Sequence, residues 1–305
     1  MPDIAIWSRC NNHCLMCSNP VVFQQESTHP YSLENLINRW SEREIPPEEP
    51  INLTGGEPTI HPDFFKVLDY FRSSHPNNRI VIASNGRIFF YEKFVKQFFS
   101  YDNSLLEIAI HGYDDKTHDA VTCIKGSFKQ TVQGIHNILR LKNKTQELEI
   151  RIVVTKMTID KLDKILSFIN KEFDIKKISN IPLMFIEMEG QAIDNISTVG
   201  LTYTEAAKYI PKVMGKWSPK IKNLRLYHFP LCTLPPKLWP SIWRTLRGEE
   251  IKYISQCKKC FVKEYCLGIH QNYLTQVGNK EFVPQKKIGL KTNTSYCNPI
   301  EKVQI

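Results

Sequence analysis

The chemistry that this sequence can support starts with three cysteines near its beginning. Cys10, Cys14 and Cys17 lie within eight residues, in the order CNNHCLMC, directly after a short apolar run. Three soft thiolates on one loop can hold three corners of an iron–sulfur cube, which leaves the fourth iron free to bind a chelating molecule. The alternatives are a zinc site, for which His13 is available as a ligand, and buried free thiols. The close spacing favours an open iron site at which a reaction can occur.

Two glycines and a carboxylate form a second motif further along the chain. Residues 53–58 read LTGGEP, at the end of the next predicted strand. Glycine lets the backbone approach a ligand closely, and a carboxylate beside it can accept hydrogen bonds from an ammonium group. Alone this would be an ordinary turn. Its place after the cysteine triad favours a ligand-binding role.

The elements that would position these motifs alternate in type through the first 190 residues. Short β-branched runs alternate with amphipathic stretches, which is the pattern of βα units around a parallel sheet. The predicted strands are 4–7, 51–54, 80–83, 106–110, 150–154 and 183–186, and the predicted helices are 32–44, 62–73, 92–99, 128–141 and 159–171. Six units are too few for a closed barrel of eight. We therefore expect an α/β fold with a partial (β/α)6 TIM-like barrel and functional residues at the carboxyl ends of its strands.

The βα alternation fades after about residue 200. A helix near 203–216 and a strand near 224–229 are followed by a proline-rich, cysteine-containing region. We predict a core domain over 1–200 and a small cluster-binding domain over 201–305. Cys123 is predicted to be a free thiol in a loop at 118–126.

Composition restricts the classes of protein to which the chain can belong. It has 305 residues, 42% of them hydrophobic, and has neither an apolar run long enough to cross a membrane nor a signal peptide. We therefore expect a soluble, cytoplasmic protein whose nine cysteines are reduced thiolates that bind metal. Residues 201–305 hold 18 Lys and Arg against 6 Asp and Glu, an excess that can attract an acidic peptide or nucleic acid, or can simply be solvated.

Together the triad and the glycine turn resemble the radical S-adenosylmethionine (SAM) superfamily. One departure is Met16, because the family usually has an aromatic residue before its third cysteine. Methionine can cover a cluster or an adenine with a soft apolar side chain. The resemblance implies a [4Fe–4S] cluster on Cys10, Cys14 and Cys17, with SAM chelated to its open iron.

The resemblance also implies which residues contact SAM. The glycine turn would bind the amino group, polar residues after the third and fourth strands would hold the carboxylate and ribose, and an arginine on the fifth strand could pair with the carboxylate. For the histidine and the arginine a structural role is the alternative. The implied residues are Gly55, Gly56, Glu57, Ser84, Asn85, His111 and Arg151. The implied reaction is reductive cleavage of SAM to methionine and a 5′-deoxyadenosyl radical, which abstracts a hydrogen from the substrate.

A second set of cysteines resembles the SPASM and twitch domains that add auxiliary clusters to such enzymes. Its centre has the spacing CxxCxxxxxC, and His270 stands where a full SPASM domain continues with a cysteine, so we expect one auxiliary [4Fe–4S] cluster rather than two. A zinc knuckle is the alternative. The expected ligands are Cys232, Cys257, Cys260 and Cys266, with Cys297 as the rival for the fourth position.

Further segments make the chain similar to the radical SAM maturases of the His-Xaa-Ser peptide system. They are PLMFIE at 182–187, GQA at 190–192, FPLC at 229–232 and LWP at 238–240. The resemblance implies modification of a small ribosomally made precursor peptide by crosslinking, epimerisation or oxidation. A flavodoxin or ferredoxin would be the reductant. Because only nine residues precede Cys10, we expect leader recognition to depend on a partner maturase or leader-binding protein, on the basic C-terminal third, or to be absent.

Other functions remain open at the level of sequence. A radical SAM enzyme acting on a small molecule or nucleotide is the main alternative. RNA modification ranks lower, because no RNA-binding module accompanies the basic charge. A binding protein on a degenerate barrel would not explain why both motifs are intact. Glu187 and Glu189, after the sixth strand, are expected to face the cavity or to serve as capping or ion-pairing residues.

Overall fold

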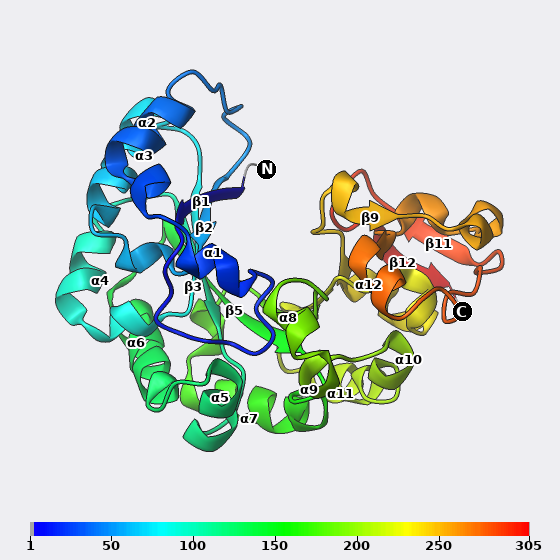
Figure 1. The fold of residues 1–305 in the computed structure, drawn as a ribbon. Coiled ribbons are helices and arrows are strands. Elements are labelled where there is room, and N and C mark those ends of the chain that lie inside the picture. Colours follow the sequence, from blue (N-terminus) through cyan, green and yellow to red (C-terminus); the bar gives the residue numbers. More distant parts are fainter. Residues whose placement is uncertain (1–2, 305) are drawn as a thin grey trace.

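The computed structural model describes residues 3–304, and its main feature is a curved parallel sheet. Eight strands pair in sequence order, and every pairing between them is parallel. Within the described residues no pairing joins the last strand to the first, so the sheet is an open arc (Figure 1). The strands are β1 (Asp3–Trp7), β2 (Ile51–Gly55), β3 (Ile80–Ser84), β4 (Ser104–Ala109), β5 (Gln146–Val154), β6 (Ile181–Phe185), β7 (Leu224–Tyr227) and β8 (Ile242–Trp243).

The predicted α/β fold with a partial TIM-like barrel is confirmed, and the sheet is longer than six units. The strand predicted near 224–229 pairs with β6 as β7, and β8 then pairs with β7. Sequence pattern did not reveal β8, because it has only two residues and follows a short, proline-containing 3-10 helix (Pro236–Ser241) rather than an amphipathic α-helix. The parallel sheet therefore extends beyond residue 200.

Helices cover the outer side of the arc (Figure 1). Between the strands lie α1 (Val21–Gln25), α2 (Leu33–Trp40), α3 (Phe64–Ser74), α4 (Glu92–Phe98), α5 (Asp115–Thr122), α6 (Ser127–Leu141) and α7 (Leu162–Glu172). After β6 come α8 (Gln191–Asp194), α9 (Ile196–Val199), α10 (Tyr203–Ala206) and α11 (Ile210–Trp217).

The interpretation of 118–126 as a loop was wrong, since helix α5 runs to Thr122. The missed signal is a capping box in which Asp114 and Thr117 satisfy each other's backbone.

The core lies between the sheet and these helices. On β2, Ile51 and Leu53 are fully buried and alternate with partly exposed Asn52 and Thr54. They belong to the same buried cluster as Phe71 of α3. Burying each such side chain stabilises the fold by about 1.5–3 kcal/mol. The opposite face of the strands stays more polar, as the hydrogen bond from Asn52 to Asp3 shows.

The C-terminal region packs on one end of the arc (Figure 1). It contains two antiparallel pairs, β9 (Ile251–Lys252) with β10 (Ile269–His270) and β11 (Gly289–Thr292) with β12 (Ile300–Gln304), and the helix α12 (Gln271–Gln276). Stacked aromatic rings join it to the barrel. Tyr203 lies 4.0 Å from Phe185 of β6 and 4.5 Å from Tyr273 of α12, measured between ring centroids. No helix in residues 3–304 is long and apolar enough to cross a membrane.

The turn between α5 and α6 depends on one carboxylate. Asp119 accepts hydrogen bonds from the backbone nitrogens of Gly126 at 2.6 Å and Phe128 at 2.8 Å, and from Ser127 Oγ at 2.8 Å. Replacing Asp119 with Ala should lower the free energy of unfolding by about 1–2 kcal/mol, because these donors lose their acceptor. Denaturant unfolding of the purified chain measures the loss. The matched change Asp115→Ala, at an exposed position of α5, should cost less than about 0.5 kcal/mol, and equal losses in the two variants would contradict this account.

Candidate functional site

The cysteine loop runs from β1 across the strand ends and is held on both sides. On one side the backbone nitrogens of His13 and Leu15 donate to the last carbonyls of α5, at 2.9 and 3.0 Å. On the other side Ala192 N of α8 donates to Cys17 O at 3.2 Å. Figure 1 shows this dark-blue segment reaching α8. The loop is therefore shaped by elements that lie far from it in the sequence.

The three thiols lie close enough together to affect one another's ionisation. Burial, followed by the charge of Glu57, raises the pKa of Cys10 to about 12. Burial also raises the pKa of Cys14, and the neighbouring Cys17 and Cys10 raise it further. Thiols in such a place ionise only when a strongly positive partner stabilises the thiolate. A bound metal ion does this and displaces the proton of the cysteine. The loop thus suits iron better than it suits free thiolates.

The donors around Cys10 also suit a bound thiolate. The backbone nitrogen of Asn12 donates to Cys10 Sγ at 3.3 Å, and Asn85 Nδ2 lies 3.9 Å from the same sulfur. Hydrogen bonds to thiolates are among the features that set the potential of a cluster. No group of His, Cys, Asp or Glu in the described residues could hold a single metal ion. In a cubane each thiolate binds a different iron, so its ligands lie farther apart than those of one ion.

The glycine turn touches the backbone just before Cys10. Gly56 N donates to Trp7 O, and Glu57 N donates to Arg9 O, each at 2.8 Å. A Cβ atom on Gly55 would lie 2.1 Å from Trp7 O, and one on Gly56 would lie 2.3 Å from Arg9 O. Gly55 also has φ +131°, which side chains rarely allow. Both glycines are needed for this approach between β1 and β2.

Glu57 ties the turn to the end of β3. Its buried carboxylate accepts hydrogen bonds from Ser84 Oγ at 2.8 Å, from Asn85 N at 2.7 Å and from Thr59 N at 3.1 Å. Burial raises the pKa of Glu57, and these donors oppose that rise. The structure therefore brings together three of the residues expected to contact SAM. The Glu57 carboxylate is already hydrogen-bonded to the other two, Ser84 and Asn85. Its contact with the SAM amino group stays a prediction.

Arg87 is a part of the site that sequence reasoning missed. Its Nη1 donates to Asn11 O and to Asn12 Oδ1, the latter at 2.9 Å, and its Nε donates to Gln130 Oε1 at 2.7 Å. The guanidinium therefore fixes the backbone between the first two cysteines. The available signal was its position directly after the predicted Ser84-Asn85-Gly86 motif.

His111 presents a buried nitrogen that the protein does not satisfy. It lies at the end of β4, its exposed fraction is 5%, and its Nδ1 has no hydrogen-bond partner within the described residues. Its ring stacks on His118 at 5.6 Å, and burial lowers the pKa of His111 to about 3, so the ring is neutral near pH 7. A buried polar atom without a partner is costly unless a ligand supplies one. This is an observation that fits a bound cofactor at these strand ends.

Arg151 has a different environment from the other expected SAM contacts. Its Nε lies 2.7 Å from Glu149 Oε1, and its Nη2 pairs with Glu107 of β4. Tyr227 of β7 donates to the second oxygen of Glu149 at 3.2 Å. The guanidinium is thus matched by two carboxylates inside the arc. The SAM carboxylate would have to compete with Glu107 and Glu149 for the Arg151 guanidinium. The contact between Arg151 and SAM stays a prediction.

The second set of cysteines lines one cavity in the C-terminal region. The cavity is bordered by Cys232, Cys257, Cys260 and Cys266. Cys297 is exposed and does not line it. Backbone nitrogens of Leu231 and Gly268 donate to Cys266 Sγ at 3.4 and 3.5 Å, and Gln285 N donates to Cys260 Sγ at 3.3 Å. Burial raises the pKa of Cys232 to about 12, and the other three thiols raise it too.

Cys123, by contrast, is an exposed free cysteine directly after α5.

Comparison with known proteins shows the family to which the chain is similar. The family described as the radical SAM superfamily matches residues 4–169, more than half of the chain. The mycofactocin maturase MftC of Mycolicibacterium smegmatis is 31% identical over 114 residues, which are 37% of this chain and 28% of that protein. The AdoMet-dependent heme synthase of Methanosarcina barkeri is 29% identical over 112 residues, 37% of this chain and 30% of that protein. The matched segment thus spans less than a third of these relatives.

Solved structures share the fold at low identity. The crystal structure of Streptococcus suis SuiB bound to precursor peptide SuiA has a TM-score of 0.56 at 11% identity, covering 73% of this chain and 48% of that one. The structure of native anSMEcpe with bound AdoMet and the Kp18Cys peptide has a TM-score of 0.54 at 19% identity, with 73% and 62% covered. These likenesses show a common architecture.

The contact between the glycine turn and the cysteine loop can be tested with a single methyl group. Gly56→Ala places Cβ against Arg9 O and Ser8 O, which belong to backbone and cannot move aside without shifting the loop. We expect the variant to bind clearly less iron at the first cysteine set after anaerobic reconstitution, measured as iron per chain. Gly215→Ala on exposed α11 meets nothing within 4 Å and should bind the wild-type amount. Wild-type iron in Gly56→Ala would show that the close approach is not required.

Proposed function

The chain belongs to the radical SAM superfamily, and from this premise we propose that it cleaves SAM reductively and modifies a ribosomally made peptide. The family implies a [4Fe–4S] cluster and SAM. The observation that carries the first half of the proposal is the cysteine loop itself. Three mutually close thiols are held at the end of β1, beside a glycine turn that admits no side chain. Such a loop offers three ligands to a cube and leaves one iron open.

Each part of the site has a role in this reaction. Bound cluster and SAM together supply an electron and a radical able to abstract hydrogen. Cys10, Cys14 and Cys17 would hold the cluster, while the amides near Cys10 stabilise its thiolate. Gly55 and Gly56 let the turn pack against the backbone before Cys10, which would bring the turn close to the bound ligand. The unmatched Nδ1 of His111 would accept or donate one hydrogen bond to it, depending on the tautomer.

The peptide substrate is the finer part of the proposal. Support comes from relatives named mycofactocin maturase, although the matched segment is only 28% of their length. The four cysteines around the C-terminal cavity support an auxiliary [4Fe–4S] cluster that would take part in the same reaction. The proposed partners are a precursor peptide, a reductant of the flavodoxin or ferredoxin class, and a partner protein that recognises the leader.

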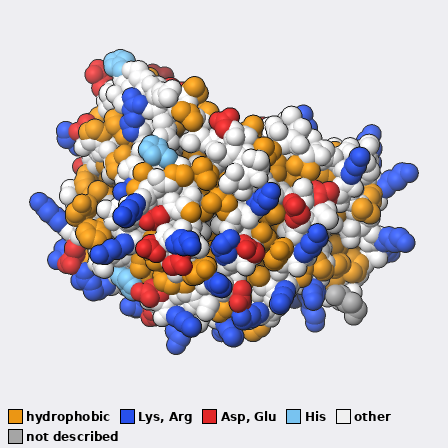
Figure 2. All heavy atoms as spheres, turned by 60° about the horizontal axis from the view of Figure 1, so that its bottom comes forward, with side chains coloured by type: hydrophobic (Ala, Val, Ile, Leu, Met, Phe, Trp, Pro, Cys, Tyr) orange, Lys and Arg blue, Asp and Glu red, His pale blue; other side chains and the backbone are white. Residues whose placement is uncertain are grey.

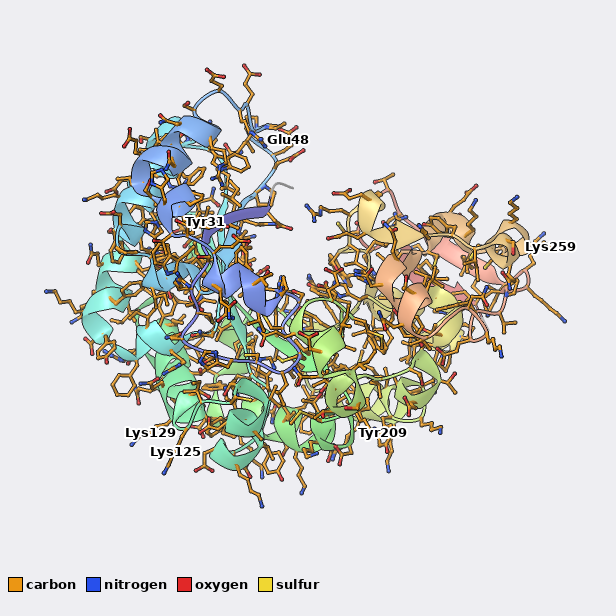
Figure 3. All side chains as sticks on the ribbon, viewed as in Figure 1. Tyr31, Glu48, Lys125, Lys129, Tyr209 and Lys259 are labelled. Atoms are coloured by element: carbon orange, nitrogen blue, oxygen red, sulfur yellow. The ribbon has the colours of Figure 1, made fainter. Side chains whose placement is uncertain are left out.

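A second candidate is a radical SAM enzyme acting on a small molecule. The observation in its favour is the similarity to a protein named AdoMet-dependent heme synthase. Nucleic acid finds less support, because Lys and Arg are scattered over the face in Figure 2 with Asp and Glu among them. Lys125 and Lys129 project outward beside each other near α5 and α6, and Lys259 projects outward from the C-terminal region on the opposite side (Figure 3). Cytoplasmic localisation stays a prediction.

The central reaction can be tested directly. After anaerobic reconstitution with iron and sulfide, addition of SAM and dithionite should yield 5′-deoxyadenosine, detected by chromatography. Cys14→Ala removes one of three cluster ligands and should reduce the yield to background. A fully loaded and reduced wild-type protein that forms no 5′-deoxyadenosine would show that the proposal is wrong.

The auxiliary cluster can be tested in a chain that lacks the first one. In the triple variant Cys10→Ala, Cys14→Ala, Cys17→Ala, the remaining iron should belong to the C-terminal cavity. Adding Cys232→Ala should lower that iron strongly, because this thiol borders the cavity. Adding Cys297→Ala should leave it unchanged. Absence of iron from the triple variant, or equal losses from the two additions, would contradict the assignment.

A further inference from the structure

Four titratable side chains meet at the carboxyl ends of β6 and β7, away from the cysteine loop's own ligands. Glu187 and Glu189 follow β6, His228 follows β7, and His270 comes from β10 in the C-terminal region. His228 Nδ1 lies 3.4 Å from Glu187 Oε1, and His270 Nε2 lies 2.8 Å from Glu189 Oε1. Carboxyl ends of parallel strands are where sites of this fold form.

Exposure separates the carboxylates from the imidazoles. The side chains of Glu187 and Glu189 are 30% and 35% exposed, whereas those of His228 and His270 are each 6% exposed. The imidazoles therefore form the buried back of the cluster. The carboxylates are partly exposed and accessible to a ligand.

The charges in the cluster leave one carboxylate without a cation. Burial lowers the pKa of His228 to about 4, so this ring is neutral near pH 7, and its Nδ1 also lies 3.3 Å from the carbonyl of Phe185. His270 is paired with Glu189. The charge of Arg151 lowers the pKa of Glu187, but its guanidinium already pairs with two other carboxylates. Glu187 is therefore a largely enclosed acid with no counterion of its own.

The ionisation of Glu187 reflects this imbalance. Burial raises its pKa to about 7; His270 and Arg151 oppose the rise, and two acidic neighbours add to it. The titratable groups around it are Arg151, Glu189, His228, Glu250 and His270. An enclosed carboxylate that lacks a partner gains most from an incoming positive charge.

A second feature of the same cluster also lacks a partner. His270 Nδ1 is buried and has no hydrogen-bond partner within the described residues. With Nε2 held by Glu189, the remaining nitrogen can still bond to a ligand. A peptide with a basic side chain would satisfy both groups. Its cation would pair with Glu187, and one of its backbone amides would hydrogen-bond to His270 Nδ1.

The cluster is also connected to the proposed reaction site. The segment that carries Glu187 and Glu189 continues through Gly190 into α8, where Ala192 N donates to Cys17 O. A Cβ on Gly190 would lie 2.3 Å from Ser18 O, so this segment packs tightly on the cysteine loop. A group bound at Glu187 would thus be held by the same segment that supports the cluster ligands.

We propose that Glu187, with Glu189, His228 and His270 around it, forms a subsite for a cationic group of the substrate, such as the side chain of lysine or arginine in a peptide. The inference rests on the proposed function, because it concerns the substrate of that reaction. Glu187 makes the ion pair. His228 is a positioning residue behind it.

The test uses the reconstituted holoenzyme and two tripeptides with blocked ends. One has arginine between two glycines, and the other has citrulline, which is neutral and of nearly the same shape. Binding is measured by calorimetric or NMR titration. The arginine peptide should bind the wild-type protein about tenfold more tightly, as expected for one partly buried ion pair. Its affinity should fall as pH is lowered through about 7, because Glu187 then takes up a proton.

Three variants separate charge from structure. Glu187→Gln should abolish both the preference for arginine and its pH dependence, whereas Glu187→Asp should retain part of the preference because the charge remains. Glu172→Gln, on the exposed pair with His136 at the end of α7, is the matched control and should keep the full preference. Equal binding of the two peptides to the wild-type protein, or an unchanged preference in Glu187→Gln, would overturn the proposal.

The formation of 5′-deoxyadenosine by the wild-type protein is followed in parallel. Cleavage of SAM without any preference for arginine overturns the subsite and leaves the proposed function standing. A preference that depends on Glu187, in a protein that does not cleave SAM, supports a cation site and overturns the proposed function.

Discussion

The site depends on one close approach of backbone to backbone, between the turn after β2 and the residues before Cys10. Gly56 N and Glu57 N donate to carbonyls at the end of β1, and neither glycine of the turn has room for a Cβ. This contact fixes where the cysteine loop begins. The carbonyls at the end of α5 and the nitrogen of Ala192 then fix its course. Three thiols gather because their loop is held at its start and on both sides.

Sequence reasoning succeeded where the cause was local. The thiolate triad and the glycine turn are short motifs, and β1 to β6 are apolar runs long enough to be recognised by period. It failed where the cause was tertiary. Strand β8 has two residues and exists because β7 offers it a partner. Arg87 matters because its long side chain crosses to Asn11 and Asn12, a contact that no spacing reveals.

The candidate site shows the same division. The sequence named five C-terminal cysteines and favoured Cys232 as the fourth ligand, with Cys297 as the rival, since both flank the central CxxC. The structure favours Cys232 because its side chain shares a cavity with the other three. The sequence also predicted that Glu57 binds a ligand, whereas four donors of the protein already hydrogen-bond to its carboxylate. Spacing identifies which residue types are present, and only packing shows which of their atoms are still free.

The unsatisfied groups are therefore the more informative part of the structure. Most buried polar atoms in folded proteins find partners, so His111 Nδ1, His270 Nδ1 and the unmatched charge of Glu187 stand out. The other unpartnered buried atoms of the described residues belong to Ser8, Trp40, Tyr70, Arg72 and His118. His111 lies just after β4, beside the helix that supports the cysteine loop, whereas Glu187 lies after β6 and His270 on β10. The segment from Glu187 to Ala192 carries the unmatched carboxylate at one end and bonds to Cys17 O at the other. Stability alone would favour filling these gaps with the protein's own side chains. An open carboxylate on a segment whose other end supports the cysteine loop is the arrangement expected when substrate and cofactor must be held in fixed relation to each other.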